Sequence, residues 1–218
     1  YLLMLLTILS TACSTTEKTG RATTSGFLKN YSMLKAGDKN QAQLIYIKQD
    51  VNWQKYDSIK VEPLVLWAPK DSALAELDKK QAQILLDFFH AQILKDLKDR
   101  YKVVSESGDN VLSLRLAITE AQASAPLRDL MSNVLPYGLA ISMGKKMLTG
   151  SHSAVGIASM EAEILDSLSG ERLVAVVDQR AGGKSLSGKF DRWDDVKKSF
   201  EHWSKKLSQG LAKAGKGK

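Results

Sequence analysis

Residues 111–119, VLSLRLAIT, alternate between large apolar side chains and polar or small ones, and no other stretch constrains the fold as strongly. Successive side chains of a β-strand point to opposite faces of its sheet, so this alternation predicts a strand with one face in a hydrophobic core. We therefore expect a sheet with at least one covered face. The apolar set is Leu112, Leu114, Leu116 and Ile118, and the other set is Ser113, Arg115, Ala117 and Thr119.

Further strands are predicted on both sides of this stretch, from short apolar runs bounded by turn residues. Pro63 marks an edge or a bulge, because proline cannot donate a hydrogen bond to a neighbouring strand. Gly170 supplies the flexible position of the turn DSLSGE, which joins the last two strands. These strands are expected at residues 42–47, 57–67, 101–104, 154–165 and 171–180.

Two long helices are predicted at residues 73–99 and 193–211, because apolar side chains recur there at steps of three and four. Ser72 is the expected cap of the first helix. Strands mostly follow strands, so the sequence predicts an α+β domain, a mainly antiparallel β-sheet with two long helices packed on one face. The apolar stripes are Leu77, Ile84, Leu85, Phe88, Phe89, Ile93 and Leu97 in the first helix, and Trp193, Val196, Phe200, Trp203 and Leu207 in the last.

The last helix allows two interpretations. Its aromatic stripe is flanked by Lys197, Lys198, Lys205 and Lys206, a pattern typical of a basic helix that lies on a membrane. The same stripe would also pack on the sheet with the lysines in solvent. We favour core packing, because these side chains are a large share of the apolar residues available to the domain.

Composition limits the domain count and the class of partner. The chain has 218 residues, 44% of them hydrophobic and 25% charged, which suits one globular domain, expected over residues 26–210. Of the net charge of +7, most lies in residues 183–218, which hold ten Lys or Arg against four acids. The basicity therefore belongs to a C-terminal segment, which ends in a tail, 211–218, expected to be disordered, and nucleic acid is not the expected partner.

The start of the chain has the features of a targeting signal. Residues 1–9 are apolar apart from Thr7, small residues follow, and Cys13 is the only cysteine, so no internal disulfide can form. Residues 1–12 have the pattern of a lipoprotein signal peptide whose charged start would precede Tyr1, and they are too short for a membrane span of about 20 residues. We expect lipidation of Cys13, although Ser10 stands where leucine is usual.

The residues after the cysteine suggest a tether and a membrane. Residues 13–25 hold no large apolar side chain and are expected to form a flexible tether. Ser14, rather than aspartate, follows the cysteine, and in Gram-negative lipoproteins this pattern indicates the outer membrane. The expected location is therefore the bacterial outer membrane, lipid-anchored and facing the periplasm.

Four segments together resemble the bacterial lipoproteins grouped as domain of unknown function 3313. The resemblance extends from about residue 25 to 210 and implies a membrane-tethered domain that faces the periplasm. It supplies no catalytic residue, because the family has no established activity. The matching segments are SGFLKNYSMLK (25–35), VNWQKYDSIKVEPLVLW (51–67), GSHSAVGIASMEAEILDSLSGERLVAVVDQRAGGKS (150–185) and FDRWDDVKKSFEHWSKKL (190–207).

Candidate catalytic motifs are weak. AGGKS (181–185) resembles the end of a phosphate-binding loop, but Asp178 stands where the first glycine belongs, which leaves at most a weak anion contact at the Gly182 and Gly183 amides. Glu161 and Glu163 share one face of a strand and are expected on its solvated side. We therefore expect no enzyme activity and no cofactor. His90, His152 and His202 lack metal-ligand spacing, and the serine motifs GKSLSG and GSHSAVG both miss that of a nucleophile elbow.

Residues 126–150 are more apolar than a surface loop needs. They either cap the open face of the sheet or form an adaptable apolar surface for a partner or ligand, and we favour capping. The leading hypothesis is a non-enzymatic envelope lipoprotein that binds an envelope protein or an apolar ligand. The alternatives are a ligand-carrying or transport-accessory lipoprotein and, third, an envelope hydrolase. The candidate apolar surface is Met131, Leu135, Leu139, Met143 and Met147.

Overall fold

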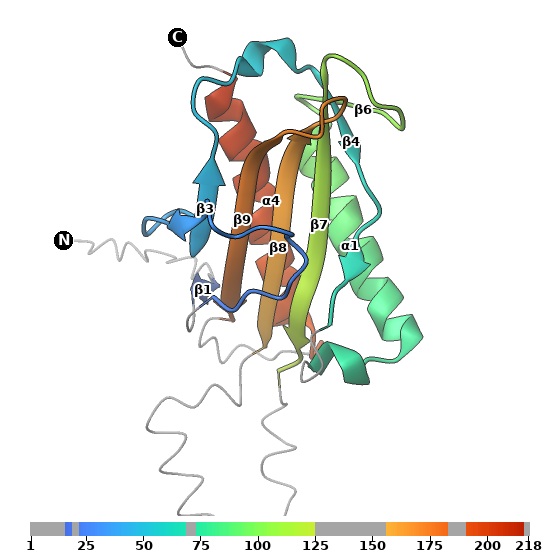
Figure 1. Ribbon diagram of the computed structural model, residues 1–218. Helices are drawn as coiled ribbons and strands as arrows, with labels where there is room; N and C mark the ends of the chain where they lie inside the picture. The colour runs from blue at the N-terminus through green and yellow to red at the C-terminus, as the bar shows by residue number, and fades with distance from the viewer. Residues whose placement is uncertain (1–15, 19–21, 69–72, 125–155, 183–190, 216–218) are drawn as a thin grey trace, which may run out of the picture.

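The computed structural model describes residues 16–18, 22–68, 73–124, 156–182 and 191–215. In these ranges nine strands form one sheet, and two long helices and two short 3-10 helices accompany it (Figure 1). The strands are β1 (Glu17–Lys18), β2 (Lys35–Ala36), β3 (Leu44–Ile47), β4 (Ser58–Val61), β5 (Val65–Leu66), β6 (Lys102–Val103), β7 (Val111–Gln122), β8 (Ile157–Asp166) and β9 (Arg172–Ala181). The helices are η1 (Trp53–Lys55), η2 (Ala73–Glu76), α1 (Lys79–Leu97) and α4 (Asp194–Ala214).

The sheet is mixed and mostly antiparallel. Its order is β2-β3-β9-β8-β7-β4-β6, with β1 paired to β9 and β5 paired to β7. The long strands β7, β8 and β9 form an antiparallel centre, whereas β4 and β5 run parallel to β7. Pro63, predicted to mark an edge or a bulge, lies between β4 and β5, both of which pair with β7. The predicted α+β class is confirmed.

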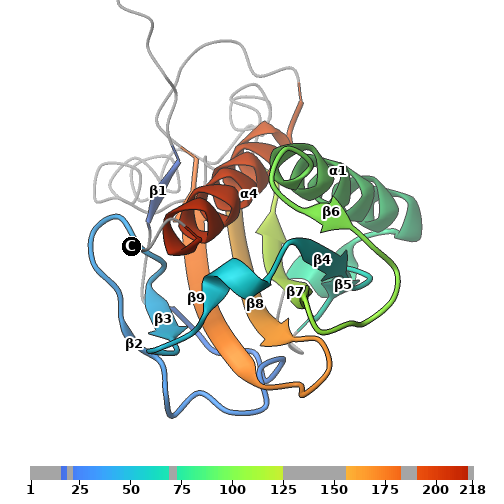
Figure 2. The ribbon, with the colours of Figure 1, turned by 90° about the horizontal axis from the view of Figure 1, so that it is seen from above.

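Both long helices cover the same face of the sheet, as the view from above shows (Figure 2). Their contact is aromatic: the Phe89 and Phe200 rings stack with centroids 4.4 Å apart and planes 6° from parallel, and the Trp203 ring lies 6.0 Å from Phe200. The stripe of the last helix therefore packs in the core, as favoured from the sequence. Burying such rings supplies much of the domain's hydrophobic stabilisation.

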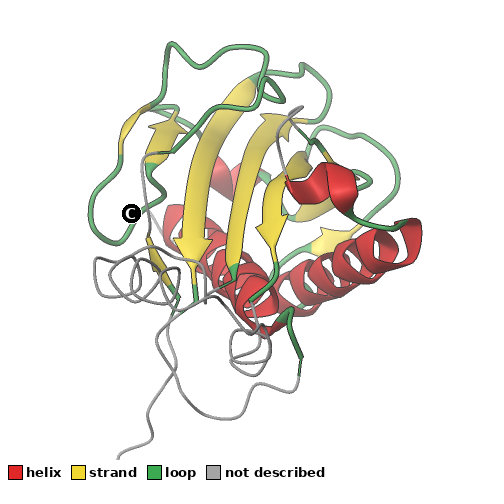
Figure 3. Ribbon diagram, turned by 90° about the horizontal axis from the view of Figure 1, so that it is seen from below, coloured by secondary structure: helices red, strands yellow, loops and turns green. Residues whose placement is uncertain are grey.

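The opposite face is covered by residues 22–34, here called the N-terminal strap, which crosses the sheet on the side away from the helices (Figures 1 and 3). Its Phe27 and Leu28 are buried against Ala117, Ala175 and Val177 of the central strands. Both faces of the sheet are therefore covered at its centre. The segment that we expected to cap this face, 126–150, lies outside the described residues.

The first long helix starts later than predicted. Residues 73–76 form η2, and α1 begins at Lys79 with Asp78 as its cap, whose carboxylate accepts a hydrogen bond from Gln81 N at 2.9 Å. Ser72 is therefore not the cap of this helix. Asp78 satisfies one of the free amides of the first turn in its place.

Two predictions at the ends of the domain are also wrong. The expected tether includes β1, which pairs with residues 180–181 of β9, and Thr16, which is buried. These residues belong to the sheet because Arg180 donates hydrogen bonds to the Thr16 side chain and carbonyl. At the other end, the expected tail starts too early, since α4 continues to Ala214 and Leu211 is buried.

Asp195 in the first turn of α4 is fully buried between two glycines at the ends of β8 and β9. Its carboxylate accepts a hydrogen bond from Gly156 N at 3.1 Å. A Cβ atom at Gly182 would lie 2.1 Å from the Asp195 Cγ atom, and one at Gly156 would lie 2.8 Å from the Asp195 Cβ atom. The helix can approach the sheet this closely only because both positions are glycine.

Candidate functional site

A groove of about 1270 Å³ runs between α4 and the sheet, beside β3. It reaches inward to Phe89 of α1, Met160 of β8 and Leu114 of β7. Among the described residues, α1 packs on α4 and β5, α4 packs on β8 and β9, and no second long helix lies on the side of α4 nearest β3 (Figure 2). We call this space the α4 groove.

The apolar part of the α4 groove has a floor of strands and a wall of helix. Ile45 pairs with Val176 and Ile47 with Val174, so these four side chains stand together on the helix side of β3 and β9. All four are partly or largely exposed, and Ile47 keeps 44% of its surface accessible. An apolar floor open to solvent is typical of a binding surface. The wall consists of Trp203, Leu207, Gly210, Leu211 and Ala214, and Trp53 of η1 also lines the groove.

The other end of the groove is polar and tightly bonded. The Asp178 carboxylate accepts hydrogen bonds from Trp203 Nε1 at 2.7 Å and from Gln43 N at 3.0 Å, and it lies 3.7 Å from Arg180 Nη1. Burial raises the pKa of Asp178, against the hydrogen bond from Trp203 and the charge of Arg180. These groups hold β1, β3, β9 and α4 together, so this end of the groove has a fixed shape.

His202 also lines the groove, and it is half-buried. Burial, together with the positive charges of Arg180 and Lys206, lowers its pKa to about 4. The imidazole is therefore neutral at physiological pH. It offers a ligand one hydrogen-bond donor and one acceptor rather than a charge.

The two glutamates of β8 are not on a solvated face, so that prediction is wrong. Glu161 is fully buried beneath the N-terminal strap, and its carboxylate accepts hydrogen bonds from Ser25 N at 2.5 Å, Leu28 N at 3.2 Å and the Tyr31 hydroxyl at 2.6 Å. Burial and this carboxylate raise the pKa of Tyr31 to about 12. Glu161 therefore fastens the strap to the sheet.

Glu163 is 3% exposed and bridges two arginines. It contacts Arg115 of β7, and its Oε2 atom lies 2.7 Å from Arg172 Nη2 of β9. Arg172 also donates to the Asn30 carbonyl at 2.6 Å, and the Arg115 guanidinium lies over the Phe27 ring. A carboxylate paired on both sides has a structural role.

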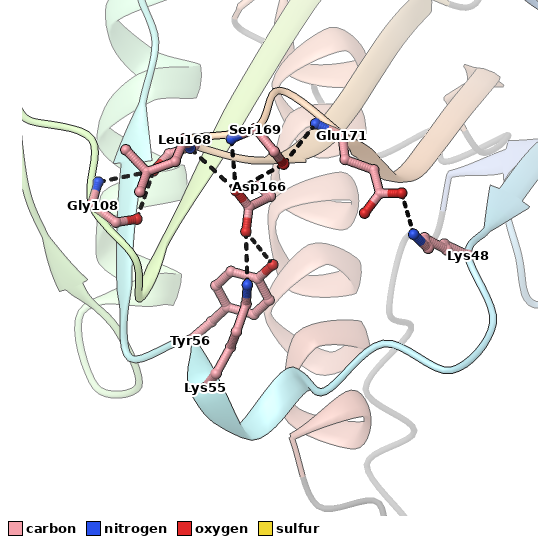
Figure 4. Close-up of polar contacts among 9 residues, drawn as sticks. Lys48, Lys55, Tyr56, Gly108, Asp166, Leu168, Ser169 and Glu171 are labelled. Atoms are coloured by element: carbon pink, nitrogen blue, oxygen red, sulfur yellow. Dashed lines mark hydrogen bonds and ion pairs between the residues drawn. The ribbon is translucent and has the colours of Figure 1, made fainter.

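A second polar cluster surrounds Asp166 at the turn between β8 and β9 (Figure 4). Its carboxylate accepts hydrogen bonds from Lys55 Nζ at 2.9 Å, the Tyr56 hydroxyl at 2.7 Å and Ser169 N at 2.9 Å. The Ser169 amide and Lys55 hold the pKa of Asp166 well below its usual range, and Asp166 in turn raises the pKa of Lys55. A protonated lysine cannot act as a general base. The hydrogen bonds to the Asp166 carboxylate instead hold the turn between β8 and β9 in place.

Asp166→Asn should lower the free energy of unfolding by about 1–3 kcal/mol near neutral pH, because hydrogen bonds to a charged group are lost. Since the folded state depresses the pKa of Asp166, its contribution is complete above the unfolded pKa of about 4 and is lost as the pH falls below it. Urea unfolding from pH 7 to pH 3 would measure this, and the variant should lose less stability over that range. Asp109→Asn, at an exposed site, should shift stability by less than about 0.5 kcal/mol.

Of the other sites predicted from the sequence, two lie outside the described residues and one is already hydrogen-bonded within the protein. Cys13 and the surface of Met131, Leu135, Leu139, Met143 and Met147 lie outside the described residues. The Gly182 amide donates to the Gly156 carbonyl at 2.9 Å, so it is not available to an anion. Within the described ranges, no three His, Cys, Asp or Glu side chains come together to hold a metal ion, and no helix is long and apolar enough to cross a membrane.

The groove residues themselves were missed from the sequence, although β9 carries a signal for them. Along one face of that strand, Val174 and Val176 are followed by Asp178 and Arg180. A core-facing strand seldom changes from apolar to charged on one face, so this change marks an unusual position. In the structure Asp178 and Arg180 are buried, and the two valines are partly exposed in the groove. Which helix stands opposite cannot be read from the strand.

The comparisons with known proteins concern family and architecture. A family model described as "Protein of unknown function (DUF3313)" matches residues 23–207, and no curated protein sequence matches the chain. Among solved structures, the PelC dodecamer from Paraburkholderia phytofirmans is similar at 10% identity and a TM-score of 0.40, over 77% of this chain and 94% of that one. XCC0632 from Xanthomonas campestris is similar at 10% identity and a TM-score of 0.41, over 78% and 92%.

A minor lipoprotein from Acinetobacter baumannii is similar at 8% identity and a TM-score of 0.35, over 72% of this chain and 94% of that one.

Proposed function

The chain belongs to the DUF3313 family of proteins of unknown function, and we propose that it is a lipid-anchored, non-enzymatic binding protein of the bacterial envelope. The observation that carries the binding role is the α4 groove, a space of about 1270 Å³ with one apolar end and one polar end. Its size and its mostly apolar lining suit an elongated ligand or segment. The groove lies beside α4, and the apolar surface considered at residues 126–150 lies outside the described residues.

The proposed anchor is an acylated Cys13 in the outer membrane. Support comes from the apolar run before this cysteine, the small residues between them and Ser14 after it. Several acyl chains on one residue would give stable anchoring, at about 0.8 kcal/mol per buried methylene. The domain would then work in the periplasm, beside the membrane that holds it.

The polar groups at the groove favour binding over reaction. Ser204, which lines it, donates to the Gln92 carbonyl and to Asp96, and the Asp178 carboxylate is held by three partners. Neither group is placed as a nucleophile next to a free base. A hydrolase therefore ranks below a binding protein.

Metabolic labelling with an alkyne fatty acid tests the anchor. The parent protein should take up the label, and Cys13→Ser should lose essentially all of it, because serine has no sulfur to acylate. Mass spectrometry of the N-terminal peptide would identify the modified residue. Equal labelling of the two proteins would refute the proposed anchor.

Substitutions of Ser14, the residue after Cys13, test which membrane holds the protein. The parent should separate with the outer membrane on a density gradient, and Ser14→Asp should move most of the protein to the inner membrane. Ser14→Ala, which changes the same position without adding a carboxylate, serves as the matched control and should leave the distribution unchanged. A parent found in the inner membrane would contradict the outer-membrane assignment while leaving acylation intact.

A further inference from the structure

The α4 groove changes character along its length. At the β1 end its lining is polar, with Thr16, Asp178 and Arg180, and towards the other end it is apolar, with Val174, Leu207 and Trp53. From residue 203 to 214 the wall measures about 17 Å, at 1.5 Å per helical residue. A long channel with one polar end and one apolar end fits an amphiphile with a single extended chain.

The exposed rim carries a charge that complements an anion. Four exposed or partly exposed lysines surround the groove, against two exposed acids. One of those acids, Asp38, lies beside Lys18, whose Nζ atom donates to the Asp38 carbonyl at 2.8 Å. A surplus of lysines around the groove attracts a negatively charged head group. The rim lysines are Lys18, Lys39, Lys206 and, towards the apolar end, Lys213, and the acids are Glu17 and Asp38.

The polar end of the groove also lies close to the anchor in sequence. Thr16 lines the groove and is held there by Arg180. Only three residue steps separate Thr16 from Cys13, and three steps span at most about 11 Å. An acylated Cys13 would therefore keep the mouth of the groove next to the surface of the bilayer.

We propose that the α4 groove takes an acyl chain of an anionic lipid from the membrane in which Cys13 is anchored. The chain lies between α4 and the floor formed by β3 and β9, and the head group remains at the lysine rim. This inference rests on the proposed function, because it requires the acylated cysteine to bring the groove to the bilayer. It adds the ligand class and the direction from which the ligand enters.

Gly210 provides a variant that fills the groove without disturbing the fold. It lines the groove, and no atom lies within 4 Å of where its Cβ would stand. Gly210→Leu therefore adds an apolar side chain to open space on a helix, where leucine is favoured over glycine. Gly210→Ala is the matched control, because it changes the same helical position and leaves most of the space open.

The experiment uses the lipidated protein in vesicles of phosphatidylethanolamine and phosphatidylglycerol, with bromine on the acyl chains of one lipid at a time. Trp53 and Trp203 line the groove and report a brominated chain inside it by loss of fluorescence. Brominated phosphatidylglycerol should quench the parent and Gly210→Ala, and Gly210→Leu should lose that quenching. Trp53→Phe should remove the part of the quenching that arises at the apolar end. Brominated phosphatidylethanolamine should quench much less.

Each other outcome overturns the inference. Equal quenching of Gly210→Leu and Gly210→Ala would place the brominated chain outside the groove, and equal quenching by the two lipids would remove the anionic preference. If neither lipid quenches, the groove takes no chain from the bilayer. In cells, a photocrosslinker at Gln209, which also lines the groove, would capture protein rather than lipid if the occupant were a polypeptide.

Failure of this inference can be separated from failure of the anchor. If the parent protein takes up no fatty-acid label at Cys13, the anchor itself is refuted. A protein that is labelled at Cys13 but not quenched by brominated lipid refutes only the ligand assignment.

Discussion

Gly182→Ala is expected to destabilise the domain by about 3 kcal/mol or more, because the new methyl group would overlap a buried side chain. The added Cβ would lie 2.1 Å from the Asp195 Cγ atom, far inside van der Waals contact. Asp195 is fully buried and bonded to Gly156 N at 3.1 Å, so it cannot move aside without breaking that hydrogen bond. Chemical denaturation of the purified variant measures the loss.

Two further variants separate the overlap from a general intolerance of alanine. Gly210→Ala lies in open space on α4 and should be neutral or stabilising by up to about 1 kcal/mol. Combining Gly182→Ala with Asp195→Gly should restore part of the stability, so that the two losses are smaller together than their sum. Additive losses in this double-mutant cycle would show that Asp195 does not cause the strain.

Glu163→Gln is expected to cost about 3–5 kcal/mol, because it leaves two arginines without the carboxylate that neutralises them. Glu163 is 3% exposed and contacts both Arg115 and Arg172. Arg115 lies over the Phe27 ring and Arg172 donates to the Asn30 carbonyl, both in the N-terminal strap. The variant should unfold at lower denaturant concentration. The strap should also be cut faster by protease than in the parent, since its fastening to the sheet is weakened.

Glu171→Gln is the matched control for this change. Glu171 pairs with Lys48 at the surface, with 53% and 34% of their side chains exposed, and such pairs contribute at most about 1 kcal/mol. A Glu163 variant that loses no more stability than the Glu171 variant would contradict the structural role of the buried pair.

The outline of the fold could be predicted because it follows from local periodicity. Leu112, Leu114 and Leu116 alternate with smaller or polar residues, and in the structure they face the helices from β7. Phe200 and Trp203 recur at helical spacing, and they pack on Phe89. In both cases the pattern of neighbours along the chain determines which face is buried, so no long-range information is needed.

The wrong predictions at Glu161 and Thr16 share one cause, which is contact between segments far apart in the chain. Glu161 alternates with apolar neighbours as a solvated residue would, yet the N-terminal strap covers it, and Leu28 of the strap lies 133 positions earlier. The residues on either side of Thr16 have the composition of a tether, yet Arg180 donates a hydrogen bond to the Thr16 side chain. A strand pattern describes two faces but does not tell whether another segment covers the second one.

By itself, the sequence determined the class of fold, the face that each helix buries and the presence of one cysteine placed where lipid could be attached. Those properties depend on the spacing of residues within single elements. Only the tertiary structure decided that Glu161 and Glu163 are structural, that Gly182 makes room for Asp195, and that α4 leaves a groove beside β3. The physical reason is that burial, close approach and open space are properties of pairs of elements, which meet only when the chain has folded.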